Sequence, residues 1–101
     1  MDTHIEEKLE AVSDPTRRLL LERLRHGPRT VGDLASDLPV SRPAVSQHLR
    51  ILKQAHLVHD QAVGTRRYYR LDPHGFADIQ AYFNSFWSEA LNAFKTKVEE
   101  K

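Results

Sequence analysis

The residues best suited to chemistry lie in the segment 40–60, which reads VSRPAVSQHLRILKQAHLVHD. Its polar side chains are hydroxyls, amides, imidazoles and cations, and no carboxylate occurs before Asp60. Surface helices usually carry both signs of charge, so a stretch without acids indicates a negatively charged partner. Guanidinium and carboxamide groups can each form paired hydrogen bonds with the edges of nucleic-acid bases. This segment therefore predicts a surface that binds double-stranded DNA.

The charge of the whole chain is arranged in three blocks. Residues 41–70 contain six Lys or Arg and one acid, which gives a net charge of +5. Residues 1–40 and 71–101 each sum to −2, so the 101-residue chain carries only +1. A basic block between two acidic ones indicates a local anionic partner and not a generally basic surface.

Sites of other kinds find little support. Ser46 and His48 are two positions apart and would point in different directions on a helix, so the hydroxyl does not meet a base. We therefore expect neither enzyme activity nor a cofactor. His56 and His59 lack a third ligand and the chain has no Cys, so we expect no metal site. Without a long apolar run or a signal peptide, the chain is expected in the cytoplasm with no membrane partner.

The pattern of apolar residues predicts four helices that would position the basic segment. The first covers residues 3–12. The second begins after Asp14, a suitable cap, and ends at Gly27-Pro28. The third begins at Thr30, which together with Asp33 resembles a capping box. Ser41 caps the fourth helix, which we expect to run for about 14 residues.

The third and fourth helices, joined by a tight turn, have the arrangement of a helix-turn-helix. Val45, Leu49 and Leu52 would form the buried stripe of the fourth helix. The remaining positions would face DNA, with the first half reading base edges and the second half contacting phosphates. These predicted DNA-binding residues are Ser41, Arg42, Pro43, Ser46, Gln47, His48, Arg50 and Lys53.

Residues 57–71, LVHDQAVGTRRYYRL, have the pattern of two strands around a glycine turn, which predicts a hairpin. Arg66 and Arg67 follow that turn and are placed to reach the adjacent minor groove or its phosphates. A long helix is expected from Pro73 to near the end. The predicted fold class is therefore mainly α with a β-hairpin wing, a winged helix-turn-helix of order α-α-α-α-β-β-α, in a single domain spanning residues 1–101.

The last helix carries an apolar stripe too large for the core of so small a domain to cover, which indicates an interface between two copies of the chain. A ligand pocket lined by Trp87 and the Phe residues at that interface is compatible with this interpretation. The stripe consists of Phe76, Ile79, Phe83, Phe86, Trp87, Ala90 and Phe94.

Three segments, AVSDPTRRLLLERL, TVGDLASDLPVSRPAVSQHLRILKQAHLV and GTRRYYRLDP, resemble the ArsR/SmtB family of bacterial winged-helix repressors. The resemblance covers nearly the whole chain. It implies a homodimer bound to a palindromic operator near the protein's own promoter, with repression relieved by an inducer, here an unknown small molecule. It also implies that the first and last helices pair across the dimer, which adds Ile5 and Leu9 to the interface.

The chain departs from the family pattern at two places. Metal-sensing members carry either a Cys pair in the helix matching TVGDLASDL or His and acid ligands in the last helix. This sequence has no Cys, and residues 76–98 contain no His. In addition, His56 stands where the family usually has the Gly that ends the recognition helix, so a left-handed conformation is expected there at a small cost in stability.

Two alternatives remain open from the sequence. The basic face could be solvated and without a partner, although helix spacing, the basic helix face and the basic hairpin tip all favour DNA. The domain could also be a winged-helix dimerisation or protein-interaction module that does not bind DNA. That alternative predicts a recognition face with acids on it, and this face has none before Asp60.

Overall fold

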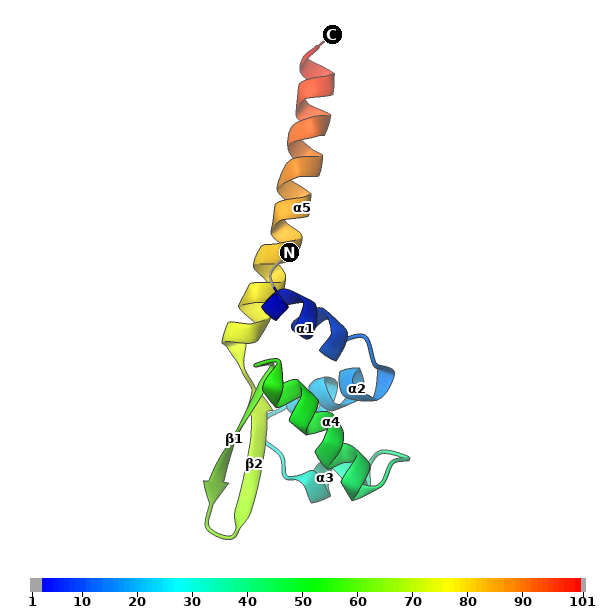
Figure 1. The fold of residues 1–101 in the computed structure, drawn as a ribbon, viewed down its shortest axis with the longest axis vertical. Helices are drawn as coiled ribbons and strands as arrows, with labels where there is room; N and C mark the ends of the chain where they lie inside the picture. The colour runs from blue at the N-terminus through cyan, green and yellow to red at the C-terminus, as the bar shows by residue number, and fades with distance from the viewer. Residues whose placement is uncertain (1–2, 101) are drawn as a thin grey trace.

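The computed structural model describes residues 3–100 and has the predicted architecture of a helix-turn-helix followed by a hairpin and a long helix (Figure 1). The fold class predicted from the sequence is confirmed, since the order is α-α-α-α-β-β-α. The elements are α1 (Thr3–Ala11), α2 (Pro15–Leu24), α3 (Val31–Ser36), α4 (Arg42–Gln54), β1 (Val58–Val63), β2 (Arg66–Leu71) and α5 (Pro73–Glu99).

Helices α2, α3 and α4 surround the core, and each contributes apolar side chains from one of its sides. Leu20 of α2, Leu34 of α3 and Leu49 of α4 are almost completely buried. Val31, Ala35 and Leu38 are half-buried against this cluster, on the inward side of α3 and in the turn after it. The packing leaves the opposite side of α4 exposed, which is the side that carries the cations.

Two arginines at the start of α2 fix its junction with α1. Nε of Arg17 donates a 2.7 Å hydrogen bond to the carbonyl of Ala11, and the Arg17 side chain is largely buried. Nη1 of Arg18 donates to the carbonyls of Val12 and Ser13. The last carbonyls of a helix have no partners within it, so these side chains supply the missing donors. The turn between α1 and α2 is thereby held by α2 itself.

Both ends of α4 are capped as the sequence predicts. The hydroxyl of Ser41 accepts a hydrogen bond from the amide of Ala44 at 3.3 Å. At the other end His56 has a φ of 61°, so the expected left-handed residue is confirmed. The amides of His56 and Leu57 donate to the carbonyls of Lys53 and Leu52, respectively. This is the Schellman arrangement, in which a left-handed residue satisfies the final carbonyls of a helix.

The hairpin pairs β1 with β2 in antiparallel register, from Val58 opposite Leu71 at the base to Val63 opposite Arg66 at the tip. Gly64 in the turn has a φ of 63°, a conformation that glycine adopts without steric cost. At the base, the backbone groups of Arg29 and Tyr69 exchange hydrogen bonds of 3.0 and 2.8 Å. Residue 29 therefore holds the hairpin against the segment that leads into α3.

Helix α5 begins on the core and then projects away from it, at the end of the molecule opposite the hairpin tip (Figure 1). The molecule is consequently elongated, with extents of 65 × 25 × 25 Å. Gly75 in the first turn of α5 is buried, and a side chain there would overlap the carbonyl oxygen of His56. Within the described residues, no helix is both long and apolar enough to cross a membrane.

Because Gly75 lets α5 lie directly on the end of α4, we expect Gly75→Ala to destabilise the fold. The added methyl group would press on backbone atoms of His56, and forced overpacking of this kind typically costs about 1 to 3 kcal/mol. The measurement is the urea concentration at the unfolding midpoint, compared with that of the unmodified protein.

Gly32→Ala is the matched control, since Gly32 also lies in the first turn of a helix. A methyl group there would meet only the flexible end of the Arg42 side chain, so it should be tolerated or slightly stabilising through helix propensity. Equal midpoints for Gly75→Ala and the unmodified protein would show that α5 can move away from His56 at no cost.

Candidate nucleic-acid interface

The outward side of α4 presents a surface without acids. Ser46, Gln47 and Arg50 are exposed, on the side of the helix opposite Val45, Leu49 and Leu52. Ser41, Arg42 and Pro43 are exposed at its N-terminus. The structure therefore places these predicted DNA-binding residues on one accessible face, as their spacing indicated.

Arg42 folds back toward α3 instead of projecting in front of α4. A methyl group at Gly32 would lie 3.0 Å from Nη2 of Arg42, so the guanidinium occupies the space that this glycine leaves free. Arg42, Arg66 and Arg67 line a groove of about 530 Å³ between α3, α4 and the hairpin, and Asp33 of α3 is the one acid in its lining. The sequence did not predict this grouping, which brings cations from the helix and the wing to one place.

Lys53 and Arg67 both bind the carboxylate of Asp60. The Nζ of Lys53 and the Nη1 of Arg67 each lie 2.8 Å from one of its oxygens. The hydrogen bond from Lys53, together with that from Arg67, lowers the pKa of Asp60 below its ordinary value of 3.8. The carboxylate is therefore ionised at neutral pH. The sequence placed Asp60 in the first strand, but it did not reveal that this acid would pair with two of the predicted DNA-binding cations.

His48 is less exposed than the other predicted DNA-binding residues of α4. Its side chain is only 22% exposed, and Nδ1 lies 3.9 Å from Oδ2 of Asp14, the N-terminal cap of α2. The reason is helical spacing, because His48 follows Val45 by three positions and so lies beside the buried stripe. His48 contributes to the packing of α4 against α2.

The exposed apolar face of α5 lies mostly beyond the core. Phe76 and Ile79 are half-buried against the core, and Ile5 of α1 is buried. Leu9 is half-buried and Ala90 is exposed. The large apolar side chains of α5 that are exposed are Phe83, Phe86, Trp87, Leu91, Phe94 and Val98. The sequence-based prediction lacked Leu91 and Val98, although both continue the same helical spacing.

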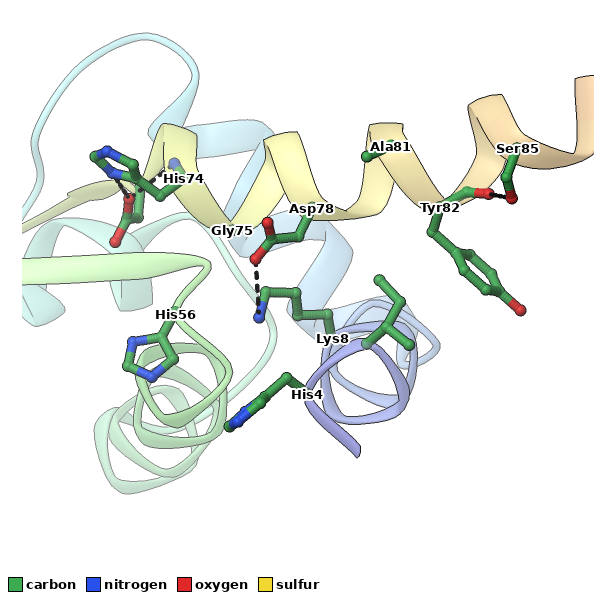
Figure 2. A pocket seen from close by; sticks show the side chains of 11 residues that line it. His4, Lys8, His56, His74, Gly75, Asp78, Ala81, Tyr82 and Ser85 are labelled. Atoms are coloured by element: carbon green, nitrogen blue, oxygen red, sulfur yellow. Dashed lines mark hydrogen bonds and ion pairs between the residues drawn. The ribbon is translucent and has the colours of Figure 1, made fainter. Parts of the chain in front are cut away.

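A cavity of about 880 Å³ lies between α1, the turn after α4 and the first half of α5. Figure 2 shows Lys8 reaching from α1 toward Asp78 on α5, a 3.5 Å ion pair in which Lys8 is almost fully buried. Neither Trp87 nor any Phe lines this cavity, so it is not the aromatic pocket considered from the sequence. In the part of the chain that the structure describes, no three His, Asp or Glu side chains are grouped to hold a metal ion.

Comparison with known proteins agrees with this geometry. Residues 14–60 match the model of the bacterial regulatory protein, arsR family. The chain is 52% identical over 92 residues to the HTH-type transcriptional regulator Rv2034 of Mycobacterium tuberculosis, covering 91% of this chain and 86% of that protein. It is 47% identical over 62 residues to the transcriptional repressor SdpR of Bacillus subtilis, covering 61% and 69%, respectively.

A solved structure shares the fold. The homodimeric winged helix-turn-helix DNA-binding domain Mb0332 from Mycobacterium bovis superposes with a TM-score of 0.69 at 27% identity, over 87% of this chain and 82% of that one. The family match covers the helix-turn-helix itself, and the relative from M. tuberculosis is similar along nearly the whole chain. The chain therefore belongs to the arsR family of bacterial regulatory proteins, a family of DNA-binding transcription regulators and not of enzymes.

Proposed function

We propose that this protein is a cytoplasmic, homodimeric repressor that binds a palindromic operator through α4 and the hairpin wing. The observation that carries the proposal is the exposed face of α4, which has no acid and lies beside the arginines of the wing. A carboxylate on such a face would meet phosphates of its own sign. The repressor SdpR and the homodimeric DNA-binding domain Mb0332 support the same assignment by similarity.

In this proposal α4 is the recognition helix and enters the major groove, with Gln47 and Ser46 at the base edges. Arg42, folded toward α3, contacts a phosphate and not a base, together with Arg50. The wing follows the adjacent minor groove, where Arg66 and Arg67 meet the DNA backbone. Lys53 approaches the backbone from the last turn of the recognition helix.

The second copy of the chain covers the exposed apolar face of α5 defined above. Six large apolar side chains along one helix form a patch that monomers seldom leave in water. A two-fold dimer would present two recognition helices, which accounts for a palindromic operator. We further propose that a small-molecule inducer binds in the cavity between α1 and α5. This cavity lies at the base of α5, so a bound inducer could change the position of the dimer helix.

The direct test is selection of bound fragments from random DNA by the purified protein. The expected result is a single inverted repeat whose half-sites are about 10 base pairs apart, centre to centre, or a multiple of that spacing. Recovery of fragments with no shared sequence would contradict the proposal and favour an interaction module without DNA specificity.

Gln47→Ala should weaken binding to the selected operator more than binding to random DNA, by about 1 to 3 kcal/mol, because only base contacts distinguish the two. Affinities for both DNAs at one salt concentration provide the measurement. Gln54→Ala is the control, since Gln54 lies on the same helix but faces α1 beside Glu7 and Glu10. Equal losses on both DNAs would remove Gln47 from the base-reading set.

Arg66→Ala should lower affinity for all DNA and make it less dependent on salt. Each phosphate contact contributes about 0.9 to the slope of log affinity against log salt concentration, so the slope should fall by roughly that amount. Arg25→Ala removes an exposed cation that caps the end of α2 and pairs with Glu22, and it should leave the slope unchanged. An unchanged slope for Arg66→Ala would exclude this side chain from the contact set.

Phe94→Glu should convert the dimer to monomers, as measured by light scattering. Phe94 is 68% exposed and lies far along α5, so its replacement should leave the fold of the protomer intact. Asn92→Glu introduces the same charge in the same turn but on the opposite side of the helix, and it should remain dimeric. Dimers of Phe94→Glu would place the interface elsewhere.

A further inference from the structure

Asp60 is the one acid in the basic block 41–70, and its carboxylate joins three elements. One oxygen binds Nζ of Lys53 in the last turn of α4, and the other binds Nη1 of Arg67 on β2, each at 2.8 Å. Asp60 itself is on β1. A single side chain therefore connects the proposed recognition helix to both strands of the wing.

The register of the hairpin explains why these groups meet. Asp60 pairs with Tyr69, so Arg67 is its diagonal neighbour on the same face of the ribbon. Nearer the base, the same face carries Val58 and Leu71, which pack against the core. The face that is apolar at the base of the wing thus continues toward the tip as a charged cluster that reaches α4.

The acid of this cluster is buried, whereas its two cations are exposed. Asp60 is only 7% exposed, whereas Lys53 and Arg67 remain 55% and 54% exposed. The acid is therefore covered by the two cations and does not face a DNA phosphate. An ammonium has three N–H donors and a guanidinium has five, so both cations retain free donors after binding Asp60. The cluster keeps a net charge of +1 on its accessible side.

The hairpin has few other charged attachments to the helices. Its base is fixed by the backbone bonds between Arg29 and Tyr69. At the same level of the hairpin, where Asp60 lies opposite Tyr69, the ion pair between Asp60 and Lys53 is the only one within 4.0 Å that links the wing to a helix among residues 3–100. Loss of the carboxylate would leave the outer part of the wing free to change its angle to α4.

We propose that Asp60 is a positioning residue of the DNA interface, which fixes the angle between wing and recognition helix and so determines where Lys53 and Arg67 meet the DNA backbone. This inference rests on the proposed function of α4 and the wing. It differs from simple masking, in which Asp60 would only reduce the positive charge of the surface. Removal of the carboxylate distinguishes the two roles. Positioning predicts a lower ratio of operator affinity to random-DNA affinity, whereas masking predicts tighter binding to both DNAs with the same ratio.

The test uses Asp60→Asn in the full-length chain, with the selected operator and random DNA of equal length as probes. Backbone contacts fix the register in which α4 meets the bases, so a displaced wing should also disturb the base contacts. The ratio of operator affinity to random-DNA affinity should therefore fall about tenfold, or about 1.4 kcal/mol. Glu22→Gln makes the same change of charge at an exposed i,i+3 pair on α2, and its ratio should not change.

Hydrogen exchange of the free protein provides the second measurement. Wing amides of residues 60–68 should exchange faster in Asp60→Asn, while the amide of Leu49 in the core reports that the fold is intact. Lys53→Gln breaks only the link to α4 and should also speed exchange in the wing. It provides the same test should the first variant fold poorly.

The outcomes separate the possibilities. A lower ratio together with faster wing exchange supports positioning. Tighter binding to both DNAs with an unchanged ratio would show that Asp60 only masks charge, and unaltered wing exchange would show that it does not hold the wing. Either result overturns the inference. If the unmodified protein selects no sequence at all, the proposed function itself fails, which is visible without any variant.

Discussion

The way in which helix α4 ends constrains the rest of the molecule. At His56 the backbone enters the left-handed region, and only three residues separate the end of α4 at Gln54 from the first strand of the wing at Val58. The carbonyl of Leu57 accepts a 2.9 Å hydrogen bond from the amide of Asp72, and the carbonyl of His56 lies against Gly75. One turn therefore fixes the directions of the recognition helix, the wing and α5 at the same time.

Much of the fold follows from local patterns in the sequence. Ser41 and Thr30 cap the helices that they were expected to cap, and the stripe of Val45, Leu49 and Leu52 is buried as its spacing predicts. The caps and the stripe depend on residues a few positions apart, so they can be derived without knowledge of tertiary packing. The left-handed residue at His56 was expected from the family resemblance, because the family usually has a Gly at this position.

The parts that escaped prediction depend on side chains brought together from distant segments. The Asp60 cluster requires the hairpin register and the height of α4 relative to β1, and neither is set by local sequence. The position of Arg42 over Gly32 depends on a side-chain conformation and on the α3–α4 angle. His48 lies at the border of the helical stripe, and its partial burial beside Asp14 could not be derived from the spacing alone.

The length of helix α5 determines how far its end moves when its base rotates. Its 27 residues correspond to about 40 Å, and the helix is fixed to the domain mainly in its first turns. It rests against His56 at Gly75 and against α1 through contacts that include the ion pair between Lys8 and Asp78. A rotation of about 10° at the first turn of the helix would move its far end by roughly 7 Å, given the same rise per residue. In a two-fold assembly the same rotation would change the separation of the two recognition helices, which must match one helical turn of DNA. In such an assembly, the close approach that Gly75 permits between α5 and His56 would help to set the distance between the two DNA-binding helices.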